Sequence, residues 1–289
     1  MFLTGPRWRR FWLGLQTLLG WAEKGYFIPY RHAGASIAPD RYPALEAHFA
    51  QAAPGFAGVL DDMADFEADL NALNGPPPRP RWDQDWFARL DGAAAYTLVR
   101  GHRPATIIEI GSGHSTRFMH AAVTDGGLSC AITSIDPQPR ADIAALPITH
   151  HRCIVQDVDR SVFDALGPGD ILFVDSSHIL MPGSDVDIVV SDILPRLPAG
   201  VLLHFHDILL PDGYPPQWAW RGYNEQQGLA ALIAGGGVEL VFSSHYAATR
   251  LADVVRNSVA GALPLNEGVP ETSLWLRKTA PGLGRLSNQ

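Results

Sequence analysis

The stretch TIIEIGSGHSTRFMH, residues 106–120, decides the fold because it joins a short apolar run to a loop with two glycines and then to a helical segment. Such an apolar run is typical of a buried strand. Gly111 and Gly113 allow a tight turn and a close approach of the backbone to a ligand. The free N–H groups at the start of the next helix favour anionic groups. The stretch therefore predicts a strand, a ligand-binding loop and a helix.

From residue 105 onward, short apolar runs alternate with segments of helical spacing. This alternation is typical of βαβ units and predicts an α/β fold with a parallel sheet and helices on both faces. Helices are expected between the runs, including short ones around Ile143 and over residues 159–167. The runs predicted as strands are 105–110, 130–136, 148–157, 170–175, 200–208, 238–244 and 272–278.

The first 80 residues differ from this pattern. Helical spacing of apolar side chains runs from Leu45 to Leu70 and is broken at Pro54 and Gly55. GPPPRPRWDQDW, residues 75–86, is the clearest linker, because consecutive prolines favour an extended chain and exclude helix. The sequence predicts an N-terminal helical extension with a proline-rich linker over 1–80 and a second domain over 81–289.

Composition limits the classes of function. The net charge of −8 gives no broad basic footprint for nucleic acid. Cys130 and Cys153 both fall in apolar runs and lack the spacing of a zinc site, so we expect two buried free thiols. A reducing cytoplasm fits this usage best.

The N-terminal stretch MFLTGPRWRRFWLGLQTLLGWAEKG, residues 1–25, has a basic start and an apolar segment. This segment is short for a membrane span and lacks a small-x-small cleavage pattern, so neither a transmembrane span nor a signal peptide is predicted. Its Trp, Leu and Arg content predicts an amphipathic helix. That helix packs on the protein's own core, or it rests on a membrane surface or a partner subunit.

Acidic residues end the second and third predicted strands. Asp136 is placed to accept hydrogen bonds from both ribose hydroxyls of a nucleoside, and Asp157 from an adenine amino group. Each acid alone is equally compatible with a solvated loop, but the series at successive strand ends favours a ligand site. A dinucleotide fingerprint would need glycine at position 116, which is Thr116, so an NAD site is disfavoured.

The motifs IIEIGSGHST, SIDPQPR, VQDVD and DILFVDSSH resemble those of class I S-adenosylmethionine-dependent methyltransferases, over about residues 95–280. In that family the glycine loop receives the methionine part of the cofactor, the next acid holds the ribose and the third meets the adenine. The resemblance implies cofactor contacts at Glu109, Gly111, Ser112, Gly113, Ser115, Asp136, Asp157 and Asp175. Ser115 stands where the family often has a third glycine, and its hydroxyl is a candidate contact for the cofactor carboxylate. The implied fold is a Rossmann-like, doubly wound, seven-stranded sheet, mostly parallel with one antiparallel strand.

A second group of candidate residues ends the fourth and fifth predicted strands. His178, His206 and Asp207 are the candidate catalytic residues, because methyl transfer requires alignment and removal of a proton from the acceptor. Strand alternation places His204 and His206 on one face. The alternative is structural: Asp175 caps a turn and His204 is a hydrogen-bonded core residue.

Asp175, His206 and Asp207 also resemble the metal positions of metal-dependent O-methyltransferases of the catechol and macrocin types. A bound magnesium or manganese ion would lower the pKa of an acceptor hydroxyl. The nitrogen of His206 departs from the oxygen ligands that are usual there. The reaction without a metal therefore stays open.

The predicted function is O-methylation of a hydroxyl on a small molecule or glycan, with S-adenosylmethionine as the methyl donor. The proline- and aromatic-rich loop 210–226 is expected to close over the acceptor; Tyr214, Trp218 and Trp220 stack on it or merely close the end of the sheet. Residues 1–80 are open to two roles, a homodimer interface or part of the acceptor pocket. Two rivals remain: a metal-dependent hydrolase or lyase, and a non-catalytic scaffold that binds the cofactor.

Overall fold

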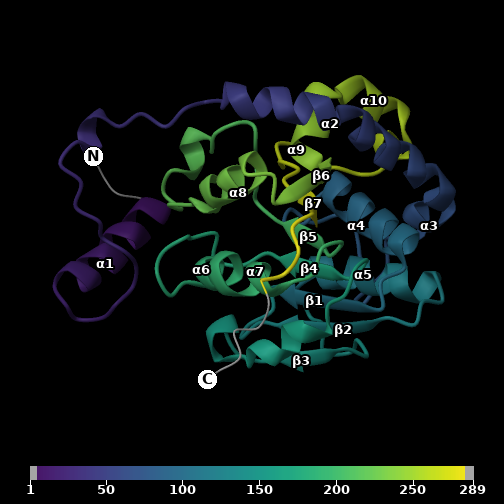
Figure 1. Cartoon of the computed structure of the whole chain (residues 1–289), viewed down its shortest axis with the longest axis horizontal. Coiled ribbons are helices and arrows are strands. Elements are labelled where there is room, and N and C mark those ends of the chain that lie inside the picture. The colour runs from purple at the N-terminus through teal and green to yellow at the C-terminus, as the bar shows by residue number, and fades with distance from the viewer. Residues whose placement is uncertain (1–4, 284–289) are drawn as a thin grey trace.

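The seven predicted strands form one sheet in the computed structural model, which describes residues 5–283 (Figure 1). Their order across the sheet is β3-β2-β1-β4-β5-β7-β6. The strands are β1 (Thr106–Ile110), β2 (Ala131–Ile135), β3 (Thr149–His151), β4 (Ile171–Val174), β5 (Leu202–Phe205), β6 (Val238–Ser243) and β7 (Leu274–Lys278). β1 to β5 pair in parallel, and β7 is antiparallel to both β5 and β6, so six strands point one way and β7 points the other. This confirms the predicted doubly wound sheet with one antiparallel strand.

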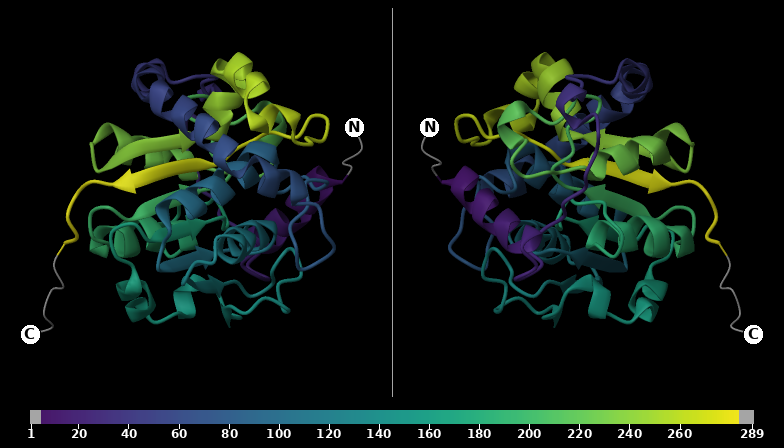
Figure 2. Two further views of the ribbon diagram at one scale, coloured as in Figure 1. Left: turned by 90° about the vertical axis from the view of Figure 1, so that its right-hand side faces the viewer. Right: turned by 90° about the vertical axis from the view of Figure 1, so that its left-hand side faces the viewer.

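Helices cover both faces of this sheet (Figure 2). The α-helices are α1 (Pro6–Leu18), α2 (Pro43–Asp62), α3 (Glu67–Ala72), α4 (Arg89–His102), α5 (His114–Asp125), α6 (Asp185–Ile188), α7 (Leu194–Arg196), α8 (Glu225–Ala234), α9 (Ser244–Arg250) and α10 (Ala252–Asn257). Shorter turns are η1 (Ala33–Ala35), η2 (Met63–Phe66), η3 (Val155–Asp157), η4 (Arg160–Ala165), η6 (Pro216–Trp218) and η7 (Val259–Ala262), and a π-helical segment, η5 (Val189–Ile193), joins α6 to α7.

The strand order places the topological switch point between β1 and β4. From β1 the chain crosses outward through α5 to β2, and from β4 it crosses in the opposite direction through α6 and α7 to β5. Right-handed crossovers in opposite directions put these helices on opposite faces. The carboxyl ends of β1 and β4 therefore border the crevice in which ligands of such sheets bind.

The third predicted strand is shorter than expected. It ends at His151, whereas the sequence predicts a strand over 148–157. β3 is an edge strand whose last pairing is between Ile135 and His151, so the ladder has no partner beyond that point. The chain turns into η3 instead, and Asp157 lies at the end of that turn. The helix predicted over 159–167 is the 3₁₀ turn η4, and no helix forms around Ile143.

The predicted break at Pro54 does not occur. α2 runs through Pro54 from Pro43 to Asp62, although an internal proline costs a helix about 3 kcal/mol. Phe49 and Phe56, on either side of it, are fully buried, and the Phe56 ring packs 6.2 Å from that of Phe242 in β6. Tertiary packing of this helix on the sheet outweighs the local preference.

The N-terminal extension has two parts with different surroundings. α2 and α3 contribute Phe49, Phe56 and Leu70 to the same hydrophobic core as the sheet. By contrast, no described residue before Tyr42 belongs to or packs against that core, and α1 stands apart from the sheet in Figure 1. The prediction that this helix packs on the protein's own core is therefore wrong for its aromatic face. None of the helices in residues 5–283 has the length and apolar character needed to cross a membrane.

The two cysteines are free, as predicted, but they are only half-buried. Cys130 directly precedes β2, and Cys153 follows β3 by two residues. Burial and the charge of Asp170 raise the pKa of the Cys130 thiol to about 11. The thiol is therefore protonated and weakly reactive at neutral pH.

Candidate cofactor site and catalytic cluster

Glycine is required at position 111. Its φ is 79°, and a Cβ atom there would lie 1.7 Å from the carbonyl oxygen of Asp175. The N–H of Gly111 donates to the carbonyl of Ile135 (3.0 Å), and the N–H of Asp175 donates to that of Ile110 (2.9 Å). The ends of β1, β2 and β4 thus meet at this loop, and any side chain would separate them.

Glu109 lies fully buried beneath the loop. Its carboxylate oxygens accept hydrogen bonds from the hydroxyls of Ser115 and Thr116, both 2.5 Å. Burial raises the pKa of Glu109 to about 8, even though the two hydroxyls lower it, and the charges of Asp175 and Asp136 raise it further. The Ser115 hydroxyl, predicted as a contact for the cofactor carboxylate, is engaged here with Glu109.

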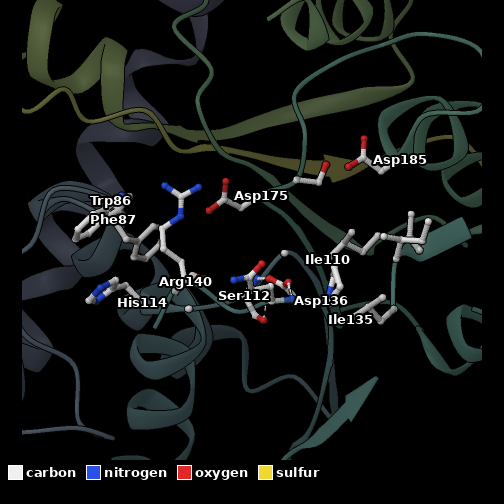
Figure 3. Close-up of a pocket in the computed structure, with 18 of the residues that line it drawn as sticks. Trp86, Phe87, Ile110, Ser112, His114, Ile135, Asp136, Arg140, Asp175 and Asp185 are labelled. Carbon is white, nitrogen blue, oxygen red and sulfur yellow. Dashed lines mark hydrogen bonds between the residues drawn. The ribbon is translucent and has the colours of Figure 1, made fainter. Parts of the chain in front are cut away.

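Asp136 fixes the glycine loop from the end of β2. One carboxylate oxygen accepts hydrogen bonds from the N–H (2.7 Å) and the hydroxyl (3.2 Å) of Ser112, and the other accepts from the N–H of Gln138 (2.6 Å). Figure 3 shows Ser112 and Asp136 side by side, with the Asp175 carboxylate across from them. The predicted glycine loop and the acid after the second strand therefore form one connected unit.

A cavity of about 310 Å³ opens over this unit. Its volume is at the lower end of the range for small-ligand sites. Six of the eight predicted cofactor residues line it, namely Gly111, Ser112, Gly113, Ser115, Asp136 and Asp175. Glu109 does not line the cavity, but it accepts hydrogen bonds from Ser115 and Thr116 beneath it.

The cavity wall next to η3 is formed by Ile154, Val155 and Gln156. Asp157 belongs to the same turn but is not among the residues that line the cavity. The role implied for Asp157 at the adenine therefore stays a prediction.

Sequence reasoning missed several residues that line the cavity, including two stacked aromatic rings and two charged side chains. The indole of Trp86 and the imidazole of His114 stack 5.7 Å apart with 4° between their planes, and both face the cavity (Figure 3). Arg140 and Asp185 complete the rim. His114 and Arg140 lie within the quoted motifs IIEIGSGHST and SIDPQPR, whereas Trp86 and Asp185 come from segments outside the motifs.

The predicted catalytic residues form a connected cluster at the ends of β4 and β5. Nε2 of His178 lies 3.3 Å from Oδ1 of Asp175 and 3.6 Å from Oδ2 of Asp207. Nδ1 of His206 lies 3.6 Å from Oδ1 of Asp175 and 3.7 Å from Oδ1 of Asp207. Because Asp175 also lines the cavity, the cluster adjoins the candidate cofactor site.

Two further buried carboxylates complete the cluster. Oε2 of Glu225, at the start of α8, lies 2.9 Å from Nδ1 of His178. Oδ2 of Asp91, in the first turn of α4, lies 3.5 Å from Nε2 of His206. Asp91 also accepts from the N–H groups of Thr272 and Ser273, 3.0 and 2.8 Å away. The distance of Glu225 and Asp91 from the histidines along the chain hid these contacts from sequence reasoning.

These carboxylates set the charge of both imidazoles. Burial lowers the pKa of His178, but hydrogen bonds to Asp175 and Glu225 outweigh it and raise the pKa well above its usual value. Burial likewise opposes a rise at His206, where the charge of Asp175 and a hydrogen bond to Asp91 raise the pKa well above its usual value. The cluster in this state is a set of imidazolium–carboxylate pairs.

His204 behaves as the structural alternative predicted. Its ring is fully buried and stacks on Phe173 at 3.6 Å, with Nε2 2.8 Å from the hydroxyl of Ser273. Burial and the nearby charge of His206 lower the pKa of His204 well below its usual value, so the ring is neutral. The centroids of the His204 and His206 rings lie 6.1 Å apart, as expected for residues on one face of β5.

The predicted metal ligands do not form a ready metal site. Within residues 5–283, no group of three or more His, Cys, Asp and Glu side chains is arranged to hold an ion. Asp175 and Asp207 direct their oxygens at the nitrogens of His178 and His206. The side chains that would bind a metal ion therefore contact one another.

The loop after β5 forms a cationic and aromatic surface next to the cluster. Nη1 of Arg221 donates to Oδ2 of Asp207 (3.4 Å), and the guanidinium lies 4.2 Å from the ring centre of Trp218. Tyr223 packs 4.6 Å from the ring of His178. Trp220 is largely exposed. Arg221 and Tyr223, in the loop expected to close over the acceptor, thus contact the predicted catalytic residues.

Comparison with known families agrees with this arrangement. Residues 108–208 match the family model of a methyltransferase domain. The matched segment starts in β1 and ends just beyond Asp207, so it contains the glycine loop, Asp136 and the strand ends that carry the cluster. No curated protein shows a significant match in sequence.

Solved structures show only distant likeness. CmcI with S-adenosylhomocysteine is 18% identical over 70% of this chain and 80% of its own, with a TM-score of 0.40. The methyltransferase PaMTH1 of Podospora anserina with the same ligand is 16% identical over 89% and 100%, with a TM-score of 0.41. The O-methyltransferase TomG of Streptomyces achromogenes with S-adenosylmethionine is 15% identical over 78% and 90%, with a TM-score of 0.42. The roles of individual residues therefore rest on the geometry of this chain; its residues 108–208 are similar to a methyltransferase domain and lie in a sheet of the predicted type.

Proposed function

We propose that this protein transfers a methyl group from S-adenosylmethionine to a hydroxyl oxygen of an acceptor, which is a small molecule or a glycan. One observation carries the proposal: Asp175 lines the cavity over the glycine loop and also contacts both imidazoles of the cluster. A methyl donor in the cavity and an acceptor at the cluster would therefore both lie next to Asp175.

The cavity offers a complementary surface for the donor. Bound S-adenosylmethionine would supply an electrophilic methyl group: as the acceptor oxygen attacks it in line, the bond from carbon to the sulfonium sulfur would break and S-adenosylhomocysteine would leave. Asp136 offers carboxylate oxygens near the rim for ribose hydroxyls. The N–H groups at the start of α5 favour the cofactor's carboxylate. Glu109 holds the loop and, when ionised, favours the cofactor's ammonium group.

The cluster is placed to take the acceptor's proton. His178 or His206 acts as the base once its ring is neutral, and Asp175, Asp207, Glu225 and Asp91 stabilise the imidazolium that results. Glu225 on one ring and Asp91 on the other also fix the tautomer, because each holds one ring nitrogen while the second faces Asp175 or Asp207. Asp207 and Arg221 border the space on the acceptor's side.

A divalent ion remains a separate proposal. Held by Asp175, His206 and Asp207, magnesium or manganese would polarise the acceptor hydroxyl. The pairing of these side chains with one another favours proton transfer without an ion. Unchanged turnover in excess chelator supports the metal-free reaction, whereas loss of turnover that manganese restores establishes the ion.

Calorimetric titration of the purified chain with S-adenosylmethionine tests the proposal. We expect saturable binding that Asp136→Ala weakens by about tenfold or more, the loss of a charge-assisted hydrogen bond of about 1.5–3 kcal/mol. Asp142→Ala, an exposed acid on a neighbouring loop that does not line the cavity, is the matched control and should bind like the parent. Asp157→Ala decides whether that side chain or the η3 backbone meets the adenine. No binding by the parent would overturn the proposal.

Two outcomes would favour the rivals predicted from sequence. Cofactor affinity without turnover on any hydroxyl acceptor would indicate a binding scaffold. Metal in the purified protein, with an activity indifferent to S-adenosylmethionine, would indicate a hydrolase or lyase.

A further inference from the structure

A second cavity, of about 700 Å³, lies between the N-terminal arm and the loops that carry the cluster. We use N-terminal arm for residues 5–42, which comprise α1 and the chain that leads to α2. One wall comes from α1 and residues 24–28, and the other from Ile179, Met181 and residues 220–222. In Figure 1 α1 lies on the same side of the molecule as α6 and α8.

Hydrogen bonds connect the N-terminal arm to the loop after β5, which forms part of the opposite wall. Nη1 of Arg10 donates to the carbonyl of Ala219 (3.1 Å), and this hydrogen bond joins α1 to the loop after β5. At the far end of the arm, the N–H of Gly213 donates to the carbonyl of Asp40 (2.9 Å) and that of Tyr42 to the carbonyl of Pro211 (2.9 Å). A Cβ atom at Gly213 would lie 1.9 Å from the carbonyl oxygen of Pro39, so the arm lies directly on this loop.

The lining has an unusual charge for this protein. Arg9, Arg10, Lys24 and Arg221 line the cavity, and no described carboxylate does, although the whole chain has a net charge of −8. The remaining lining is largely apolar or aromatic, including Leu13, Phe27, Ile28, Ile179, Met181 and Trp220. Cations beside an apolar surface complement a molecule that has an anionic group and an apolar body.

The cavity also adjoins the cluster. Arg221 lines the cavity and donates to Asp207. Asn224 lines it as well, and its N–H donates to the carbonyl of His178 (3.1 Å). A molecule bound in this cavity would therefore have one end next to His178 and Asp207, which belong to the cluster proposed to remove a proton.

The lining is poorly suited to a neutral sugar. Hydroxyl-rich ligands need side chains that both donate and accept, and the main amide of this cavity is already used. Asn224 accepts from the N–H of Leu180 (2.7 Å) and donates to its carbonyl (3.1 Å). Most of the remaining polar groups are cations, which only donate.

We propose that this cavity binds the methyl acceptor as an anionic amphiphile, a molecule with an acyl, prenyl or aromatic body and a phosphate, sulfate or carboxylate group. The part of this inference that concerns the acceptor rests on the proposed methyl transfer. Binding of the amphiphile stands by itself.

Calorimetry on the full chain with three probes of equal chain length, each below its micellar concentration, tests the proposal. We expect dodecyl phosphate to bind at least about tenfold more tightly than dodecyl maltoside, as an ion pair of about 1.4 kcal/mol would give, and dodecyltrimethylammonium not to bind. Inorganic phosphate should bind more weakly than dodecyl phosphate. Equal binding of the anionic and neutral probes, or of inorganic phosphate and dodecyl phosphate, would overturn the proposal.

Paired charge reversals locate the site. Arg9→Glu with Arg10→Glu should weaken dodecyl phosphate binding about tenfold or more. Arg31→Glu, in the same arm but outside the cavity, should leave it within about twofold, since a solvated charge contributes little. Equal effects of the two changes would show that only the overall charge of the arm matters, and would overturn the proposal that this cavity is the binding site. Binding only to phosphatidylglycerol vesicles, or only by a dimer of the chain, would likewise overturn it in favour of a membrane surface or a second copy.

Cofactor affinity separates the two proposals. Retained binding of S-adenosylmethionine without binding of dodecyl phosphate overturns the amphiphile and leaves methyl transfer standing. If the protein binds dodecyl phosphate but has no affinity for S-adenosylmethionine, the amphiphile site is supported and its link to methyl transfer is overturned.

Discussion

His178 and Asp207 face each other across the ends of β4 and β5 in the same unfavourable backbone conformation. Nε2 of His178 lies 3.6 Å from Oδ2 of Asp207, and the φ angles of the two residues are 60° and 56°. Left-handed backbone costs a non-glycine residue about 1–3 kcal/mol, although His and Asp tolerate it better than most. Because two such residues are in contact at the proposed acceptor site, we infer that the position of their side chains has been favoured at a cost in folding stability.

Replacing Asp207 should separate strain from function. Asp207→Ala and Asp207→Gly both remove the carboxylate, but only glycine relieves the backbone. We expect Asp207→Gly to be more stable than Asp207→Ala by about 1 kcal/mol, and both to lose about 100-fold or more in methyl-transfer rate. Thermal unfolding and single-turnover kinetics measure the two effects.

Arg103 supplies the control, because it has φ 51° at the end of α4, well away from the cluster. Arg103→Gly should show a similar relief relative to Arg103→Ala and keep full activity. A strongly destabilised Asp207→Gly that still turns over would show that the Asp207 side chain serves only the fold.

Much of this architecture follows from local pattern. The apolar runs of β1, β4 and β5 predict buried parallel strands, and the acid and glycines at their ends predict where a ligand binds. The end of β3 was not predictable, because it is set by the last pairing available from β2 and not by the apolar residues that continue beyond His151. Pro54 shows the same limit for a helix, since its neighbours are held by distant aromatic contacts.

The cluster was only partly predictable for a similar reason. Asp175, His178 and Asp207 lie within four residues of the ends of β4 and β5, so their convergence follows from the parallel sheet. Asp91 reaches His206 only because the start of α4 is held by the segment before β7: Glu271 accepts from Arg89 and from the N–H of Leu90, which is 181 positions away. A contact of that separation leaves no periodic signal in the sequence.

Gly111 should be far less replaceable than other glycines with positive φ. Gly111→Ala brings a Cβ atom within 1.7 Å of the Asp175 carbonyl oxygen, so β1 and β4 must separate. We expect loss of S-adenosylmethionine binding together with a fall of several degrees in the unfolding temperature. Gly127→Ala is the control, since Gly127 has φ 55° but open space around its Cβ position, and it should cost only about 1 kcal/mol with binding intact. Equal effects of the two changes would refute the steric argument.

Removing the internal proline of α2 should stabilise the protein. Pro54→Ala restores an N–H donor in the middle of the helix and relieves the clash of the ring, gains that exceed the entropy proline removes from the unfolded chain. We expect the free energy of unfolding to rise by about 1–2 kcal/mol in denaturant titrations. Pro43→Ala, at the first turn where proline is well tolerated, should bring no gain. A loss of stability in Pro54→Ala would mean that the helix is adapted to its proline.

Glu109 should make both stability and cofactor binding depend on pH. Burial raises the pKa of its carboxyl from an ordinary 4.5 to about 8 in the fold, so the folded chain retains a proton that the unfolded chain loses. The contribution to stability is therefore full below about pH 4.5 and is lost as the pH rises to about 8. Glu109→Gln, which stays neutral, should flatten this decline in pH-dependent unfolding experiments.

Binding of S-adenosylmethionine should report the same proton. A cationic ammonium group near Glu109 favours the carboxylate, so binding at pH 7 should release up to about one proton and affinity should rise as the pH approaches 8. Titrations at pH 7, where the cofactor's amino group is still mostly protonated, in buffers with different ionisation enthalpies measure this release, which should disappear in Glu109→Gln. A binding enthalpy that is the same in all buffers at pH 7 would show that Glu109 keeps its protonation state, and that the loop recognises the cofactor without it.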